Sequence, residues 1–219
     1  MDEATIILKE RLDTLLNILL DLEFYKQNSE TISNREKKYF ERVCKNSQFF
    51  HTSYKVFLKL FIIEIYKLLD PSGDYSVSKL INFCETNRNK IVWDDQPGLD
   101  FFSQLKKKYQ FEQEEVFKIK TLRDKFYAHT DKNRFEVIPE IDKEKLWETL
   151  DKLQKIFQQI CQHYNNHYWL FNIQYKGIPE LKMISNYKDF ISLIQAHKKE
   201  GKESVSIQDL RKIYGNYNY

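Results

Sequence analysis

Glycine and proline, the residues that most often form turns, are scarce in this sequence, which holds 5 glycines and 4 prolines in 219 residues. That share is about 4%, where average proteins have roughly 12%. A sandwich or barrel of short strands needs a turn residue every 8–12 residues or so, and stretches of dozens of residues here contain neither. We therefore expect an all-α fold, a helical bundle of long antiparallel helices with shorter C-terminal helices.

The chain is long enough, and at 42% hydrophobic residues apolar enough, for one sizeable core. We expect a single domain over residues 1–219, with its core at about 33–170 and a C-terminal helical extension at 177–219. The formal net charge is +3. This neither requires nor excludes a polyanionic partner, because a basic groove can lie in a nearly neutral chain.

The three cysteines, Cys44, Cys84 and Cys161, are odd in number and far apart, which is typical of a protein from a reducing compartment. The first twenty residues have neither the basic start nor the small-residue cleavage site of a signal peptide. Charges interrupt every long apolar stretch, unlike a membrane span. We expect a cytoplasmic protein that does not bind a membrane.

Apolar residues recur every three or four positions along most of the chain, as on the buried face of a helix. Ser33 and Glu36 have the spacing of a capping box, which predicts a helix that starts at Ser33 and runs, with a kink, to Asp70 as the most buried helix. Asp142 is placed to cap a later long helix. The other expected helices span residues 5–25, a short stretch from Ser76 or Ser78, 99–109, 111–128, 186–198 and 207–214.

One constellation indicates chemistry: Arg123, Asp124, His129 and Asp131 lie within nine positions at the end of an expected helix. Arginine offers a planar cationic fork to a phosphodiester, and histidine can move a proton near neutral pH. RNA cleavage without metal needs both proton transfer and charge stabilisation, because the 2′-hydroxyl must lose a proton and the phosphorane must have its negative charge stabilised. We expect Arg123 to hold the phosphate, His129 to act as general base or acid, and Asp124 to orient one of them.

The spacing of the motif limits how one helix can use it. Arg123 and His129 are six residues apart, about 600° around and roughly 9 Å along an ideal helix, so a continuous helix does not aim both at one phosphate. Either the helix breaks near Ala128, as Asp131 and Asn133 favour, or the site pools residues from two subunits. A two-fold homodimer would gather two arginines and two histidines in one cleft.

An arginine, a polar residue, a short spacer and a histidine at a helix end resemble the motif of the HEPN superfamily. The segments LKLFIIEIYKLLDPSGDYSVSKLINF and IKTLRDKFYAHTD resemble its abortive-infection branch, the AbiU-type proteins, at motif level over roughly Val56 to Asp131. The resemblance implies a helical bundle, often dimeric, with Arg123, Asp124 and His129 at the dimer cleft. It also implies a metal-independent endoribonuclease that leaves a cyclic phosphate and a 5′-hydroxyl.

Basic residues are concentrated around this motif. Between Ser103 and Arg134, 9 basic residues face 5 acidic ones, an excess of +4, which favours a polyanion-binding cleft. The simpler interpretation is a solvated helix face, with Arg123 paired to Glu115, Asp124 or Asp131 and His129 capping the helix end. The residues we expect to bind RNA are Lys106, Lys107, Lys108, Lys120, Lys125, Lys132 and Arg134.

Other patterns give little support to other chemistry. Cys161, His163 and His167 have a spacing that can share a metal, but the segment lacks the glutamate of a zincin and a fourth ligand, so we expect structural roles and no metal. Five scattered glycines build no phosphate loop or dinucleotide fingerprint, and we expect no cofactor.

Three functions stay open. The first is an endoribonuclease of a phage-defence or toxin–antitoxin system, acting on RNA as a homodimer and with an antitoxin or nucleotidyltransferase as a candidate partner. The second is a non-catalytic helical module that binds a protein or nucleic acid through the same cleft. In the third, the domain is itself the substrate of a nucleotidyltransferase, with Tyr127 as the acceptor.

Overall fold

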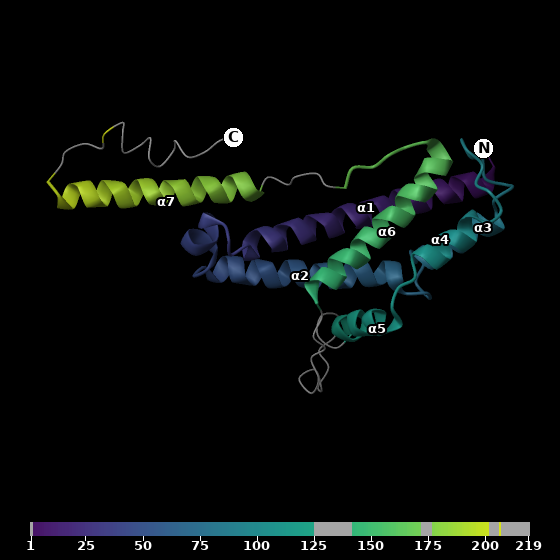
Figure 1. The fold of residues 1–219 in the computed structure, drawn as a ribbon, viewed down its shortest axis with the longest axis horizontal. Coiled ribbons are helices and arrows are strands. Elements are labelled where there is room, and N and C mark those ends of the chain that lie inside the picture. Colours follow the sequence, from purple (N-terminus) through teal and green to yellow (C-terminus); the bar gives the residue numbers. More distant parts are fainter. Residues whose placement is uncertain (1, 125–141, 172–176, 202–205, 207–219) are drawn as a thin grey trace. The chain divides into compact units, whose positions relative to one another are not determined.

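A computed structural model describes residues 2–124, 142–171, 177–201 and 206 (Figure 1). Helices and no strands are found in these residues, so the expected all-α fold is confirmed. The chain divides into two compact units, one of Met1–Lys26 with Phe57–Ile173 and the other of Gln27–Val56 with Gln174–Tyr219. The expectation of a single domain stays a prediction.

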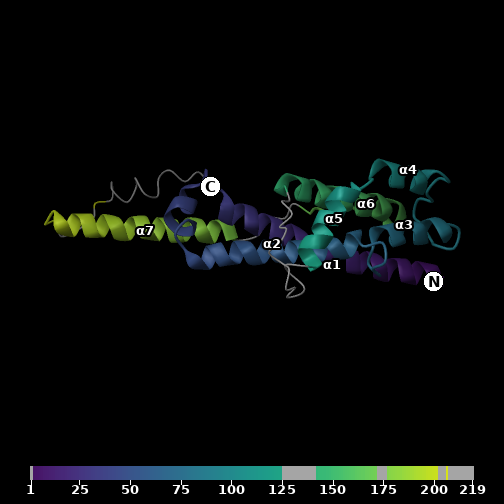
Figure 2. The same cartoon turned by 90° about the horizontal axis from the view of Figure 1, so that it is seen from below.

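The first unit contains parts of two long helices, α1 (Glu3–Ser33) and α2 (Gln48–Leu69), and four whole helices. These four are α3 (Val77–Thr86), α4 (Phe101–Lys108), α5 (Gln113–Leu122) and α6 (Lys143–Asn165) (Figures 1 and 2). All six contribute side chains to one hydrophobic core. Its centre includes Phe61 of α2, whose ring meets Trp147 of α6 edge to face at 4.8 Å between centroids.

The amphipathic patterns at both ends of this unit are confirmed. In α1, the leucines at 8, 12, 15, 19 and 22 are buried. In α6, the apolar residues that recur every three or four positions are buried as well, namely Leu146, Leu150, Leu153, Ile156, Phe157 and Ile160. Asp142 caps α6 as expected, since its carboxylate accepts a hydrogen bond of 2.9 Å from the Glu144 N–H. Ser76 is the N-cap of α3, with its hydroxyl 2.7 Å from that of Ser78.

The helix expected from Ser33 to Asp70 is wrong in its start, whereas its end is confirmed because α2 runs to Leu69. Ser33 is the last residue of α1, and its hydroxyl lies 3.4 Å from the Glu30 carbonyl oxygen. Asn34 takes the cap-like role, because its side-chain oxygen accepts from the Glu36 N–H at 3.1 Å. α1 outlasts its predicted end at residue 25, and Ser29 and Ile32 in the added turns are buried, so packing outweighs the modest helix propensity of this polar stretch.

Between Ser33 and α2, the chain forms a π-helical turn, Phe40–Cys44, before α2 begins at Gln48. This stretch was expected to be the most buried helix, but the apolar face of α2 is buried only from Phe61 to Leu69, and Phe49 near its start is 71% exposed. Periodicity identified the helical face, but it overestimated how much of that face the core covers.

The second unit is built from the end of α1, the π-helical turn, the start of α2 and α7 (Gly177–Lys199). Its small core joins Tyr39, Val43, Cys44 and Leu181, and Asp189 of α7 pairs with both Lys38 (3.1 Å) and Arg42. The helix expected at 186–198 thus begins earlier, at Gly177. The helix expected at 207–214 lies outside the described residues.

Candidate functional site

Arg123 and Asp124 directly follow α5, and these two residues continue the helix in a π-helical conformation. Ile119 and Leu122 are buried on the inner face of α5 and fix it against the core. Because residues three or four apart share a helix face, this anchoring brings Arg123 over the end of α2 and its Tyr66.

The Arg123 guanidinium stacks on the ring of Tyr66, with its central carbon 3.9 Å from the ring centroid. Tyr66 is only 5% exposed. Arg123 Nε also donates to Asp124 Oδ1 at 2.6 Å, and Nη2 contacts the same oxygen. Of the three carboxylates offered by the simpler interpretation of the sequence, Asp124 is therefore the partner among the described residues. The Arg123 side chain remains 28% exposed.

Asp70 belongs to the same cluster and is held by a tight turn. Its carboxylate accepts from the Ser72 N–H at 3.0 Å and the Ser72 hydroxyl at 2.7 Å. These two hydrogen bonds lower the pKa of Asp70, and the positive charges of Arg123 and Lys120 lower it further. Burial, followed by the negative charge of Asp70, raises the pKa of Tyr66. At neutral pH, Asp70 is thus ionised and the Tyr66 hydroxyl is neutral.

The described part of this cluster can bind an anion through one arginine. Asp124 uses the Nε–Nη2 edge of the guanidinium and Tyr66 covers one face. Within the described residues, no acceptor meets the edge formed by Nη1 and the outer proton of Nη2. That edge matches the two oxygens of a phosphodiester, and it lies on a side chain that is partly open to solvent.

The rest of the predicted catalytic motif falls outside the described residues. His129 lies in the stretch 125–141, together with Lys125, Lys132, Arg134 and Tyr127. The helix break near Ala128 and the dimer cleft therefore stay predictions.

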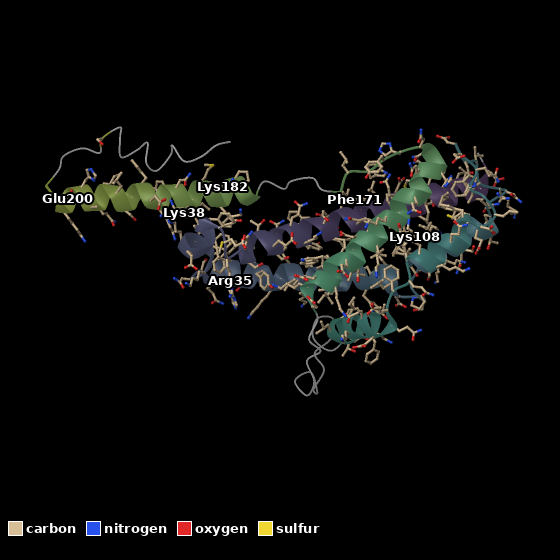
Figure 3. All side chains as sticks on the ribbon, viewed as in Figure 1. Arg35, Lys38, Lys108, Phe171, Lys182 and Glu200 are labelled. Carbon is tan, nitrogen blue, oxygen red and sulfur yellow. The ribbon has the colours of Figure 1, made fainter. Side chains whose placement is uncertain are left out.

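Four of the residues predicted to bind RNA are described, and they divide into two groups. Lys120 is exposed on α5 and its charge acts on Asp70, so it lies in the field of the Arg123 cluster. Lys106, Lys107 and Lys108 end α4, which packs against α3. Lys106 is already paired with Glu85 of α3 at 2.6 Å, while Lys107 and Lys108 are exposed. Figure 3 labels Lys108 at the end of α4. Nothing in the described residues brings this run of lysines into contact with Arg123.

Tyr66 and Asp70 were missed as site residues in the sequence. They are four residues apart, so they share one face of α2 as it ends. Their spacing was visible in the sequence, but only the packing of α5 on α2 shows that Arg123 reaches them.

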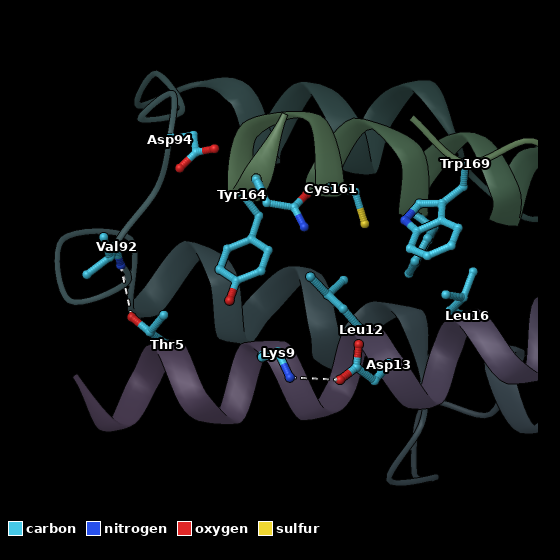
Figure 4. A pocket seen from close by; sticks show the side chains of 12 residues that line it. Thr5, Lys9, Leu12, Asp13, Leu16, Val92, Asp94, Cys161, Tyr164 and Trp169 are labelled. Atoms are coloured by element: carbon cyan, nitrogen blue, oxygen red, sulfur yellow. Dashed lines mark hydrogen bonds and ion pairs between the residues drawn. The ribbon is translucent and has the colours of Figure 1, made fainter. Parts of the chain in front are cut away.

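A separate cleft of about 580 Å³ opens between α1, the loop 87–98 and the C-terminal half of α6. Figure 4 shows Tyr164 and Trp169 on either side of Cys161, with Leu12 of α1 opposite. Burial raises the pKa of the Cys161 thiol to about 12, so the cleft offers no thiolate nucleophile near neutral pH.

The predicted metal-spacing residues lie beside this cleft and have structural contacts. The His163 ring Nδ1 is 2.9 Å from an Asp95 carboxylate oxygen, and the His167 ring lies 4.4 Å from that of Trp169. The described residues contain no group of three histidine, cysteine, aspartate or glutamate side chains that could hold a metal ion. The same part of the chain contains no helix long and apolar enough to span a membrane.

The described residues form a helical core with Arg123 and Asp124 directly after α5, as the resemblance to HEPN domains implied. The family model of AbiU2, a HEPN family, matches residues 6–180 of the chain. The chain therefore belongs to this abortive-infection-related HEPN family. No curated protein and no solved structure matches it.

Proposed function

We propose that the protein is a metal-independent endoribonuclease of a phage-defence or toxin–antitoxin system, and that its site lies in the cleft of a homodimer. The observation that carries the proposal is the arrangement of Arg123, which presents a two-donor edge while Tyr66 and Asp124 hold the rest of its guanidinium. Membership of an abortive-infection-related HEPN family supports it further.

In the proposed reaction, the 2′-hydroxyl of RNA gives its proton to a base and its oxygen attacks the adjacent phosphorus. The bond from phosphorus to the 5′ oxygen then breaks, and that oxygen takes up a proton. The products are a 2′,3′-cyclic phosphate and a 5′-hydroxyl. Arg123 would bind the phosphate and stabilise the phosphorane charge, and His129 would transfer a proton. Asp124, through its contact with Arg123, would orient the arginine.

Incubation of mixed RNA with the purified protein in EDTA tests this proposal. We expect cleavage by the unmodified chain, and a loss of at least about a hundredfold in Arg123→Ala and His129→Ala, the scale on which a single stabilising donor acts. Lys118→Ala is a matched control, because Lys118 lies on the same helix but pairs with Glu114 at 2.7 Å. Equal cleavage by all four proteins, or none across varied RNA and pH, would rule the proposal out.

A non-catalytic module that binds a partner is the second candidate, and one observation favours it. Arg123 and Lys106 both have carboxylate partners within the chain, as they would in a structural role. This candidate expects His129→Ala to keep RNA or protein binding intact, and charge reversal at Lys106, Lys107 and Lys108 to weaken it. A pull-down or gel-shift measurement with these variants separates it from the nuclease.

A further inference from the structure

We propose that Tyr66 is a positioning residue, whose ring sets the plane of the Arg123 guanidinium so that its Nη1–Nη2 edge meets the phosphodiester of RNA. The inference rests on the proposed ribonuclease function for its substrate. Tyr66 lies outside the arginine–histidine motif and belongs to α2, whereas Arg123 directly follows α5.

The guanidinium has a limited number of ways to bind, and the structure accounts for most of them. One edge, Nε with Nη2, goes to Asp124, and one face lies on Tyr66. A planar group fixed by one edge and one face keeps little freedom to rotate. The remaining two-donor edge therefore has a defined direction, which a phosphate needs in order to be bound by two parallel hydrogen bonds.

Tyr66 is a suitable support because it is itself held in place. Its side chain lies in the hydrophobic core at 5% exposure, and its carbonyl oxygen accepts from the Asp70 N–H at 2.9 Å. Arg123, in contrast, is a long side chain at a helix end, where an unsupported arginine samples many rotamers. Because the buried ring is fixed, stacking on it limits the rotamers of Arg123, and the cation–π attraction favours the stacked state.

Asp70 does not take the remaining edge in the described residues. Asp70 lies one helical turn after Tyr66, and its Oδ1 accepts both hydrogen bonds from Ser72. The cluster also includes the positive charge of Lys120, which acts on Asp70. An incoming phosphodiester is therefore offered the arginine edge without first displacing Asp70.

The stack itself can be tested without enzyme activity. Protons above an aromatic ring resonate upfield, so the Arg123 Nε–H signal in a nitrogen–proton correlation spectrum should lie upfield of its position in the urea-unfolded protein. Arg123→Lys assigns the signal by removing it. We expect the upfield position in wild type and Tyr66→Phe, which keeps the ring, and its loss in Tyr66→Leu. An ordinary position in folded wild type would overturn the proposal even if Tyr66→Leu did not fold.

Orientation is then tested with inorganic phosphate and with RNA. Phosphate should shift the Arg123 signal in wild type and Tyr66→Phe at similar concentrations. In Tyr66→Leu, the same shift should need a phosphate concentration at least about fivefold higher. With RNA, Tyr66→Leu should lower kcat about tenfold with little change in KM. Phe61→Leu is the matched control, since it removes another buried ring of α2 that packs on Trp147 instead, and it should leave kcat unchanged per folded molecule.

The two proposals fail in different ways. If wild type cuts no RNA, the ribonuclease function fails, while the stack and the phosphate titration still decide whether Tyr66 orients Arg123. If wild type cuts RNA and Tyr66→Leu matches it in both kcat and phosphate response, the positioning role is overturned and the nuclease stands.

Discussion

Two helix ends in the first unit carry the same kinds of group, a cationic or protonatable side chain with a carboxylate and an aromatic ring. At the end of α5 these are Arg123, Asp124 and Tyr66. At the end of α6 His163 lies 2.9 Å from an Asp95 carboxylate oxygen, and its ring meets Phe101 at 4.5 Å. The two clusters differ in whether their hydrogen-bond donors all have acceptors among the described residues.

The α6 cluster closes the helix. The backbone N–H groups of Asp94 and Asp95 donate to the carbonyl oxygens of Tyr164 and His163 at 3.2 and 3.0 Å, which satisfies acceptors that a helix end leaves open. His163 Nδ1 lies 2.9 Å from the Asp95 carbonyl oxygen as well. At the end of α5, one edge of Arg123 meets no acceptor in the described residues. Residue types alone therefore do not distinguish a structural cluster from a binding site, whereas the balance of donors and acceptors does.

Arg123→Lys makes the sharpest distinction between the two helix ends. We expect it to lower kcat/KM for RNA by about a hundredfold, because lysine keeps the charge but cannot offer two parallel donors. Initial rates in EDTA measure the effect. His163→Ala, made in parallel, should leave the rate per folded molecule within about twofold. A large loss in His163→Ala with none in Arg123→Lys would reverse the roles of the two clusters.

Asp124→Asn should have a smaller effect, about tenfold on kcat. The amide keeps an oxygen acceptor for Arg123 Nε but loses the negative charge that strengthens the contact. Rates measured beside Glu114→Gln, a carboxylate of the same helix that pairs with Lys118, show whether the loss is specific. Wild-type kinetics in Asp124→Asn would show that the carboxylate does not orient the arginine.

His163→Ala should instead reduce stability. It removes the contacts with Asp95 and Phe101 that fasten the loop 87–98 to α6, and we expect the free energy of unfolding to fall by about 1–2 kcal/mol. Urea denaturation followed by circular dichroism measures it. His51→Ala is a control, because His51 is an exposed histidine and should change stability by less than about 0.5 kcal/mol. Equal stabilities of wild type and His163→Ala would mean that the His163 side chain does not fasten the loop.

The smallest expected effect is on the pH dependence of stability. The folded-state pKa of Asp70 lies below the ordinary value of 3.8, so its carboxylate stabilises the fold above that pH. This stabilisation is lost as the pH falls through the lower, folded-state pKa. Asp70→Asn should therefore show a smaller loss of stability than wild type between pH 5 and about pH 2.5 in urea denaturation. Identical pH profiles would contradict the turn-based account of Asp70.

Local rules predicted much of the fold, because they depend on residues a few positions apart. The cap at Asp142 and the buried seam of α6 follow directly from such spacing. The same rules failed at Ser33, since Asn34 offers an equivalent oxygen one residue later. Tyr66 beneath Arg123 could not be predicted, because periodicity places Tyr66 on a buried face without showing which helix crosses it.

The central claim is that the 2′-hydroxyl of RNA attacks a phosphate bound at Arg123, and the ends of the products test it most directly. In EDTA, we predict products with a 2′,3′-cyclic phosphate and a 5′-hydroxyl, identified by mass spectrometry. A substrate with a single 2′-deoxy nucleotide at the cleavage position should stay uncut there. Products with a 5′-phosphate and a 3′-hydroxyl, or cleavage of the deoxy-substituted bond, would contradict the account.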